Sequence, residues 1–381
     1  MASQGLKKAV AEAFALADVQ LDGGRPWDAH VRDDRFYGEV FGRGSLGLGE
    51  AYMDGYWDCD DLPSFFEHVY RVDLQSSHLT RATRAHYLRS RLFNRQRISR
   101  AFQVGRRHYD LGNDLYRAML GPRMVYSGCL FADGGQGDLD PARDLAAAEE
   151  AKLELICRKL GLRSGQRILD IGCGWGSFGR YAAERYGVEV VGITVSTEQA
   201  ALGAELCAGL PVSFELRDYR AVEGTYDHIV SIGMLGHVGY KNYRTLMGVA
   251  HRVLRDDGLF LIHTMGANRS AIAADPWLDR YIFRNGMAPS VAQLGEAFEQ
   301  LLVMEDWHNF SVDYGHTCLA WLENFERAWS HLEGDRYDGR FRRMWRYYLC
   351  CFAAAFFART LETWDIVLSK QGGRGKYRSI R

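Results

Sequence analysis

The sequence predicts an α/β fold in which a doubly wound, mostly parallel sheet follows a smaller, mainly helical domain. Between residues 166 and 263, apolar runs of strand length alternate with helical segments, a pattern typical of parallel sheets. Before this region, apolar and aromatic residues recur at helical spacing. A chain of 381 residues also exceeds the usual size of a single core. We therefore expect a small domain at residues 1–105 and a larger one at residues 106–381.

The small domain is expected to be helical. Residues 7–18 place Val10, Phe14 and Leu16 at helical spacing, and aromatic clusters follow at 52–57 and 62–69. The clusters indicate a core face, and an apolar groove for a hydrophobic substrate fits the same pattern. Residues 42–50 are rich in glycine, but no Gly-Lys-Ser/Thr follows them. This stretch is therefore not a phosphate-binding loop.

Residues 76–107 are strongly basic, with nine arginines and no acidic residue. Tyr87, Leu92 and Phe102 lie among the arginines. A basic amphipathic helix of this kind suits an anionic membrane surface, where each basic residue contributes about 1 kcal/mol of attraction. A nucleic-acid backbone and a solvated interdomain helix are the alternatives. We favour the membrane, and expect no nucleic acid as a partner.

The alternating region predicts five strands, at residues 167–171, 188–193, 212–216, 228–232 and 259–263. Helices are expected at 145–160, 178–186 and 198–207. Ligands of such sheets bind beyond the carboxyl ends of the strands. The predicted site is therefore made of five segments: 172–176, 194–199, 217–219, 233–237 and 263–266. Beyond them we expect strand and loop at 303–310, helices at 319–329 and 341–364, and a frayed basic tail at 370–381.

The first of these segments follows a buried strand and reads Asp170-x-Gly172-x-Gly174-x-Gly176. Glycines let the backbone take positive φ and approach a ligand closely, and the next helix offers free N–H groups. A nicotinamide loop would read G-x-G-x-x-G, with an acidic residue about 20 positions later. Here the second strand ends in Thr194 instead. The pattern favours a loop for S-adenosylmethionine (SAM), and a tight turn without a ligand is the alternative.

Composition sets limits on location and on metal binding. The net charge is −1, and no apolar run reaches the length of a membrane span. The N-terminus lacks the apolar core of a signal peptide. None of the eight cysteines forms a C-x-x-C pair, and no histidine cluster completes a zinc pattern. We expect reduced thiols, a cytoplasmic protein and no metal site.

Several motifs together resemble the cyclopropane-fatty-acyl-phospholipid synthases, relatives of the mycolic acid cyclopropane synthases. They are Gly44–Glu50 (GSLGLGE), His108–Asp114 (HYDLGND), Leu169–Gly176 (LDIGCGWG), Gly192–Gln199 (GITVSTEQ) and Met304–Phe310 (MEDWHNF). The resemblance implies a class I SAM-dependent methyltransferase with a Rossmann-like sheet. It also implies a homodimer, peripheral at the inner face of the membrane, with residues 1–105 contacting lipid. The implied reaction transfers a methyl group to the double bond of a phospholipid acyl chain, and a carbocation then loses a proton.

The resemblance also implies site residues. Those for SAM are Tyr126, Ser127, Asp170, Gly172, Gly174, Thr194, Gln199 and Asp218. The catalytic residues are His263, Tyr314 and His237. A bound bicarbonate, held by His263, the Met265 backbone and Tyr314, acts as the base in the family. Simpler interpretations remain: His263 and Tyr314 as core residues, Asp218 as a helix cap, and Asp170 as a group that orients the glycine loop.

Two departures from the family pattern concern the bicarbonate site. Gly128 stands where members have cysteine, and Gly236 stands where they have the glutamate that helps to hold the ion. Losing one partner of a buried ion typically costs about 1–3 kcal/mol. Four outcomes follow: a cyclopropane made with bicarbonate or another base, a methyl-branched or methyl-alkene product, a different substrate, or a homologue that binds SAM or lipid without catalysis.

Overall fold

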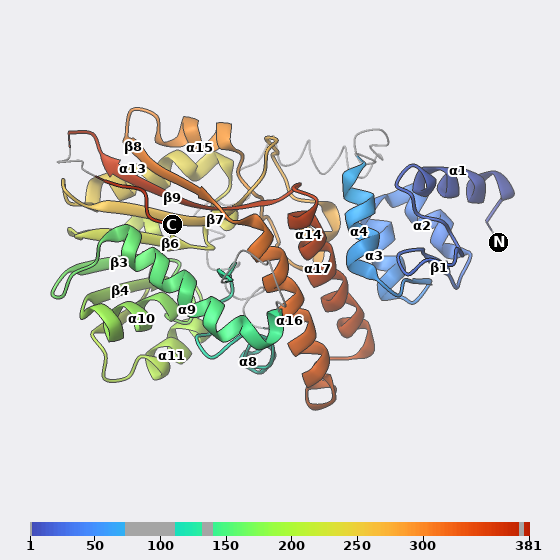
Figure 1. The fold of residues 1–381 in the computed structure, drawn as a ribbon, viewed down its shortest axis with the longest axis horizontal. Helices are drawn as coiled ribbons and strands as arrows, with labels where there is room; N and C mark the ends of the chain where they lie inside the picture. Colours follow the sequence, from blue (N-terminus) through green and yellow to red (C-terminus); the bar gives the residue numbers. More distant parts are fainter. Residues whose placement is uncertain (1, 73–110, 132–139, 373–376) are drawn as a thin grey trace.

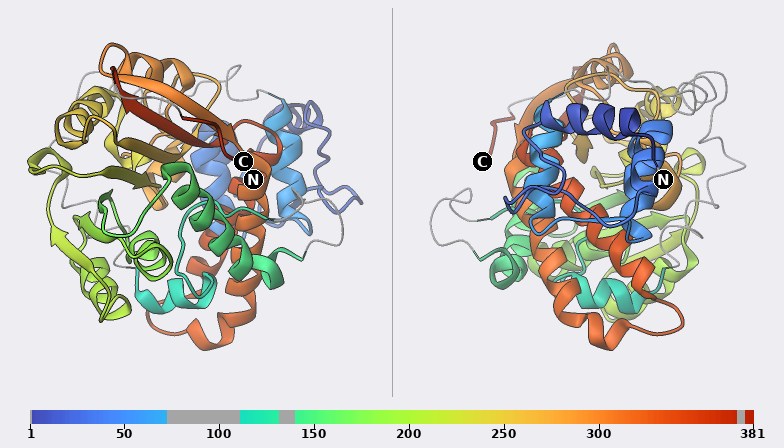
Figure 2. Two further views of the ribbon diagram at one scale, coloured as in Figure 1. Left: turned by 60° about the vertical axis from the view of Figure 1, so that its left-hand side comes forward. Right: turned by 90° about the vertical axis from the view of Figure 1, so that its right-hand side faces the viewer.

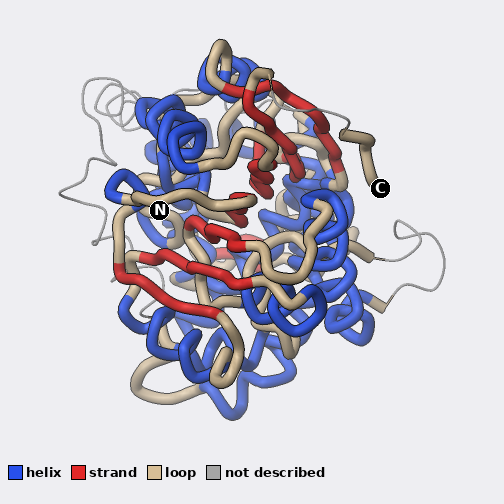
Figure 3. The backbone as a smooth tube through the Cα atoms, turned by 90° about the vertical axis from the view of Figure 1, so that its left-hand side faces the viewer, coloured by secondary structure: helices blue, strands red, loops and turns tan. Residues whose placement is uncertain are grey.

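The computed structural model describes residues 2–72, 111–131, 140–372 and 377–381. Its centre is a seven-stranded sheet with the order β5-β4-β3-β6-β7-β9-β8 (Figures 1 and 3). The strands are β3 (Arg167–Ile171), β4 (Glu189–Thr194), β5 (Val212–Leu216), β6 (His228–Ile232), β7 (Leu259–Gly266), β8 (Leu302–Asn309) and β9 (Glu362–Lys370). The first five are parallel, and β9 runs antiparallel to both β7 and β8. The predicted α/β class with a mostly parallel sheet is confirmed.

Helices cover both faces of the sheet. Along β3, Ile168 belongs to one buried cluster and Leu169 to the other, as expected for a strand with two covered faces. The first face packs against α9 (Pro141–Leu160), α10 (Ser177–Tyr186) and α11 (Thr197–Leu206). The second packs against α13 (Tyr243–Val253) and α15 (Val291–Phe298). The parallel strands therefore end together at one edge of the sheet, between the two layers.

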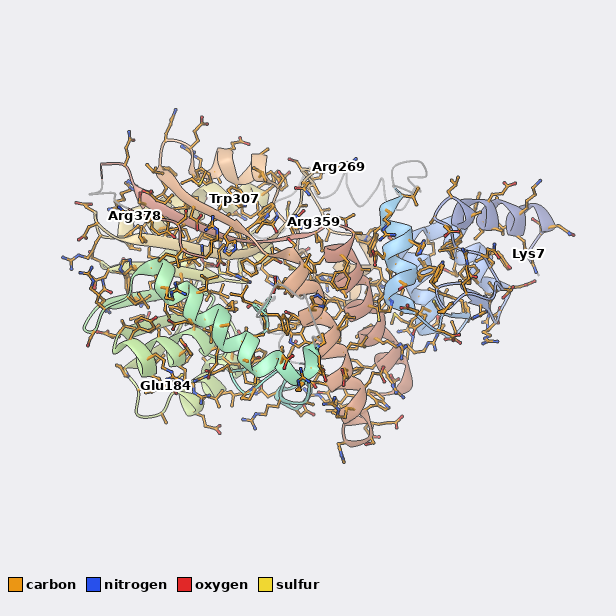
Figure 4. All side chains as sticks on the ribbon, in the orientation of Figure 1. Lys7, Glu184, Arg269, Trp307, Arg359 and Arg378 are labelled. Atoms are coloured by element: carbon orange, nitrogen blue, oxygen red, sulfur yellow. The ribbon has the colours of Figure 1, made fainter. Side chains whose placement is uncertain are left out.

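Two predictions for the C-terminal region were wrong. The helix expected at 341–364 ends at Phe357 as α17 (Gly339–Phe357), and Trp364 lies in β9. β9 is buried on both faces, so its apolar residues do not alternate and the sequence pattern cannot separate it from the helix. Trp364 packs edge to face, at 5.0 Å, against Trp307 of β8. Trp307 is labelled in Figure 4. The C-terminal tail, which we expected to be frayed, is anchored to β8, because Ser379 and Arg381 both donate hydrogen bonds to Asp306.

The N-terminal helices lie against the C-terminal helix α17 (Figures 1 and 2). They are α1 (Gln4–Ala15), α2 (Arg35–Arg43), α3 (Ser45–Met53) and α4 (Leu62–Arg71), with a short ribbon of β1 (His30–Val31) and β2 (Trp57–Asp58). Phe66 of α4 meets Tyr347 of α17 edge to face at 4.8 Å. Arg343 of α17 donates to the Trp57 carbonyl at 2.9 Å and to Asp58 at 2.7 Å. The predicted aromatic clusters therefore form core contacts with α17.

The glycine-rich stretch 42–50 forms the junction of α2 and α3. Gly44 takes φ 57°, and a Cβ on Gly49 would lie 2.3 Å from Trp277 of α14 (Pro276–Tyr281). The basic segment 76–107, its expected membrane role and the predicted boundary at residue 105 lie outside the described residues. All eight cysteines are buried as free thiols. In the described part of the chain, no helix combines the length and apolarity that a membrane crossing requires.

Candidate active site

The glycine loop joins β3 to α10 at the carboxyl edge of the sheet. Gly172, Gly174 and Gly176 all have positive φ, at 83°, 55° and 80°. A Cβ on Gly172 would lie 2.7 Å from Met234, and a Cβ on Gly176 would lie 2.5 Å from Phe214. Side chains are excluded at both positions by conformation and by space. The loop therefore brings its backbone directly against the adjoining cavity.

A cavity of about 170 Å³ opens beside this loop. All eight residues predicted to bind SAM line it, and so does His237. Four of the five predicted segments contribute to its wall, together with residues 124–127 and Lys152. The fifth segment, 263–266, does not line the cavity. The first residue of this segment is nevertheless close to the cavity, because the His263 carbonyl accepts a hydrogen bond from the N–H of Gly233 in the cavity wall at 2.9 Å.

Thr194, Gln199 and Asp218 are each held by local hydrogen bonds. Thr194 Oγ1 donates to Gln199 Oε1 at 3.0 Å and accepts from the Ser196 N–H at 3.2 Å. Asp218 accepts from the Arg220 N–H and pairs with its guanidinium, both at 2.9 Å. Asp218 therefore caps the turn at Tyr219–Ala221, as the simpler interpretation held, while also lining the cavity.

Asp170 and Lys152 are two buried ionisable residues of the cavity wall. Asp170 is 2% exposed, and its Oδ1 has no hydrogen-bond partner within the described ranges. Burial raises the pKa of Asp170 to about 7, and the nearby Lys152 opposes the shift. Lys152 is itself 1% exposed and donates to Ser127 Oγ at 2.9 Å. Among the described residues Asp170 Oδ1 makes no hydrogen bond to the glycine loop, so this oxygen is available to a ligand.

The segment 121–131, which carries Tyr126 and Ser127 into the wall, is held by side chains at every second residue. Glu149 of α9 accepts from the N–H groups of residues 121, 123 and 125 at 3.0, 2.9 and 3.2 Å. Lys152 holds residue 127, and Thr317 and Asp313 of α16 (Ser311–Leu332) accept from residues 129 and 131. Two helices thus replace a neighbouring strand as the partner of this extended backbone.

His263 lies within β7, three residues before the strand ends at Gly266, and is 1% exposed. Its Nδ1 is 2.9 Å from Oδ1 of Asp365, its register partner on β9, which is also fully buried. Its Nε2 has no hydrogen-bond partner among the residues described. Burial lowers the pKa of His263, and Asp365 opposes this shift. His263 is therefore not a core histidine with both ring nitrogens hydrogen-bonded, because among the described residues only its Nδ1 has a partner.

Tyr314 and Gly128 are in direct contact. Tyr314 is buried, stacks on Phe356 at 4.4 Å and meets Trp321 edge to face. A Cβ on Gly128 would lie 2.9 Å from Cδ1 of the Tyr314 ring. The tyrosine therefore lies where a side chain at position 128 would begin.

Gly236 behaves differently. It lies in the short helix α12 (Leu235–Val238). Of the residues that the structure describes, only Met287 comes within 4 Å of a Cβ built there, through its carbonyl at 3.6 Å. Its neighbour His237 faces Phe283 at 5.9 Å, and burial lowers the pKa of His237 to about 4. Position 236 therefore has room for a side chain that this chain does not supply.

The five positions implied for bicarbonate do not form a side-chain cage for an anion. Gly128 and Gly236 contribute no side chain, and Met265 offers only its backbone. A neutral His263 that donates its Nδ1 proton to Asp365 presents a lone pair at Nε2, which can accept the single O–H of a bicarbonate but cannot donate to its charged oxygens. Tyr314 is then the single side-chain donor of the set. A buried anion requires more than one such partner.

Comparison with known proteins decides the family. The mycolic acid cyclopropane synthetase family matches residues 96–366. The chain belongs to this family. The cyclopropane-fatty-acyl-phospholipid synthase of Escherichia coli K12 is 45% identical over 362 residues, covering 94% of this chain and 92% of that protein. The tuberculostearic acid methyltransferase UfaA1 of Mycobacterium tuberculosis is 30% identical over 359 residues, covering 90% and 82%.

Solved structures agree with this assignment. The mycolic acid cyclopropane synthase CmaA1, in complex with SAH and CTAB, is 27% identical with a TM-score of 0.63, covering 71% of this chain and 98% of that one. As a member of the cyclopropane synthase family, the chain is a SAM-dependent methyltransferase that modifies lipids.

Three polar residues of the site were not predicted from the sequence: Glu149, Lys152 and Asp365. The available signal for the first two was a glutamate and a lysine three positions apart on the apolar face of a predicted helix, near Leu145, Leu153 and Ile156. Asp365 gave none, because the predicted helix stops at Trp364 and the sequence pattern predicts no element at position 365.

Proposed function

We propose that this enzyme transfers the methyl group of SAM to the double bond of an unsaturated phospholipid acyl chain and closes a cyclopropane ring. The observation that carries the proposal is the likeness to the Escherichia coli phospholipid synthase over nearly the whole chain, including the N-terminal region. The cavity of about 170 Å³ supports it, since it gathers the predicted SAM residues at the carboxyl edge of the sheet.

SAM fits the chemistry of this cavity. The orphaned Oδ1 of Asp170 and the other polar wall residues can accept hydrogen bonds from a ligand. The glycine backbone allows close approach. SAM supplies an activated methyl group when bound. The protein must hold the acyl double bond near it in a dry pocket, because an alkene is a weak nucleophile and depends on proximity. Aromatic faces near Tyr126, which meets Trp321 at 5.2 Å, can stabilise the resulting cation.

The test is an incubation of the protein with SAM and vesicles of dioleoyl phosphatidylethanolamine and phosphatidylglycerol. Fatty acid methyl esters are then analysed by mass spectrometry with fragmentation, because a ring and a methyl-alkene have equal mass. A cyclopropane product supports the proposal. Turnover of SAM on a small amine but not on the vesicles would refute it. SAM-dependent thermal stabilisation without turnover would indicate a non-catalytic homologue.

A methyl-branched or methyl-alkene product is the second candidate. Gly128 and Gly236 favour it, because they remove side chains from the site where the cation loses its proton. The tuberculostearic acid methyltransferase, matched over 90% of this chain, bears a name that fits such a product.

We further propose that the enzyme is a homodimer at the inner face of an anionic membrane, with no nucleic acid as a partner. The basic segment 76–107 supports the membrane contact on sequence grounds, and the homodimer is what the family resemblance implies. Binding to phosphatidylglycerol vesicles should weaken when Arg89, Arg91, Arg95 and Arg97 are neutralised, and unchanged binding would contradict the role of the segment.

A further inference from the structure

We infer that His263 is itself the general base of the deprotonation step in this enzyme, and that Asp365 is the positioning residue that prepares it. The inference rests on the proposed function and concerns the step that follows methyl transfer. In this inference, Nε2 of the His263 imidazole, and not a bound bicarbonate, accepts the proton that the new methyl group loses.

The two side chains are fixed by the sheet. His263 and Asp365 are register partners on the antiparallel strands β7 and β9. Their side chains are 1% and 0% exposed, and His263 Nδ1 lies 2.9 Å from Asp365 Oδ1. Because β9 is inserted between β7 and β8, neither strand can shift without breaking both ladders. The backbone of both residues is therefore fixed, and the hydrogen bond to Asp365 sets the orientation of the imidazole.

The hydrogen bond also selects the tautomer. A carboxylate accepts but does not donate, so the proton of a neutral His263 resides on Nδ1 and the lone pair on Nε2. The buried Nε2 has no partner among the described residues. An unpartnered nitrogen in a nearly fully buried ring is costly unless a ligand or a reaction uses it. This is the arrangement in which an oriented imidazole accepts a proton.

The charges around the imidazole suit this role. Asp365 faces it from β9 and raises its pKa, while Lys152 faces it from α9 and lowers it. His308 of β8 is the register partner of Asp365 on the other side. Burial is the largest effect, and it lowers the pKa of His263 and favours the neutral imidazole. Once the imidazole is protonated, the Asp365 carboxylate stabilises the imidazolium that has formed.

Proton removal from the new methyl group and ring closure take place together. After methyl transfer, the acyl chain carries a positive charge on the carbon next to the methylated one. Nε2 takes a proton from the new methyl group, and the electron pair of that C–H bond forms the third bond of the ring. The imidazolium then releases its proton to water. No co-reactant other than SAM and the alkene is required.

The same geometry explains why the two glycines can be tolerated. The bicarbonate positions do not form a cage for an anion, since Gly128 and Gly236 supply no side chain. A base built from protein side chains has no need of that cage. The enzyme should then work without bicarbonate.

The first experiment compares the wild type with Asp365→Asn in the vesicle assay, in argon-purged buffer and in buffer with added bicarbonate. We expect the wild-type rate to be equal in the two buffers. In Asp365→Asn we expect kcat to fall on the order of 100-fold, with KM for SAM unchanged and with ring product giving way to methyl-alkene. Because Asp365 raises the pKa of His263, its loss should also move the acidic limb of kcat to lower pH.

The control is Asp306→Asn, which removes a carboxylate of equal burial from the neighbouring strand. Asp306 is 3% exposed and bonds to Lys159, Ser379 and Arg381, away from His263. Both variants should lose thermal stability, and only Asp365→Asn should change the product ratio. A wild type that needs bicarbonate, or an Asp365→Asn enzyme with unchanged ring yield, overturns the inference.

The second experiment is independent of activity. Nitrogen-15 NMR of histidine-labelled full-length protein, with His263→Gln to assign the signal, reports the tautomer directly. We expect a proton on Nδ1 and none on Nε2 at pH 7, and a change in this pattern in Asp365→Asn. A proton on Nε2 of the wild type refutes the assignment. If the vesicle assay shows no methyl transfer at all, the proposed function fails, and the NMR result still decides the state of His263.

Discussion

Gly128 lies against the ring of Tyr314 so closely that a Cβ at position 128 would be 2.9 Å from Cδ1 and 3.0 Å from Cγ of the tyrosine. These are the atoms at the base of the ring, which is stacked on Phe356 at 4.4 Å and cannot swing aside. Any side chain at position 128 would therefore collide with the Tyr314 ring.

Gly128→Ala should destabilise the protein by about 1–3 kcal/mol, the usual cost of overpacking a core. Chemical denaturation measures the change. The matched control is Gly236→Ala, whose new Cβ meets its nearest atom at 3.6 Å. It should leave the free energy of unfolding within about 0.5 kcal/mol of wild type. Equal effects of the two substitutions would contradict the contact at Gly128.

Gly236→Glu should make ring formation respond to added bicarbonate, which in the wild type it should not. The position has room for a side chain, and the new carboxyl group supplies the partner that the family resemblance assigns to the ion. We expect a higher ring fraction in bicarbonate buffer than in argon-purged buffer, measured on the methyl esters. Identical rate and product in both buffers would sink the idea that position 236 controls anion binding.

Lys152→Met should weaken SAM binding about tenfold, since it leaves Ser127 without its donor and Asp170 without its nearby cation. Isothermal titration calorimetry measures the affinity. Lys159→Met is the control, because Lys159 is an equally buried lysine of the same helix that pairs instead with Asp306 at 2.5 Å. Both should lower stability, but a loss of SAM affinity in the control would argue against a specific role for Lys152.

Glu149→Gln should flatten the dependence of stability on pH. Burial raises the pKa of Glu149 from 4.5 to about 7 in the folded protein. Between these values the unfolded chain loses a proton that the folded chain keeps, so the free energy of unfolding falls as pH rises through this window. The contribution is on the order of 1–3 kcal/mol.

Urea denaturation at several pH values between 4.5 and 7.5 measures this slope. Glu150→Gln alters the next residue of the same helix, whose side chain is 41% exposed and pairs with Arg123. It should keep the wild-type slope. A variant of Glu149 with that same slope would show that its proton is not linked to folding.

The sequence by itself determined the fold class, the family and the residues around the cavity. The reason is local: a glycine loop, an apolar run of strand length and a helix of period 3.6 are each encoded in neighbouring residues. Once five parallel strands are recognised, their carboxyl ends must meet at one edge. Asp170, Thr194 and Gly233 were placed together in this way, and the structure has all three in one wall.

Only the tertiary structure decided what surrounds those residues. Asp365 reaches His263 because β9 returns antiparallel between β7 and β8, across 102 residues of sequence. Tyr314 meets Gly128 because α16 lies against the segment held by Glu149 and Lys152. Such contacts depend on register and packing between distant elements. No local pattern records them, and they decide which group in this enzyme can take the proton.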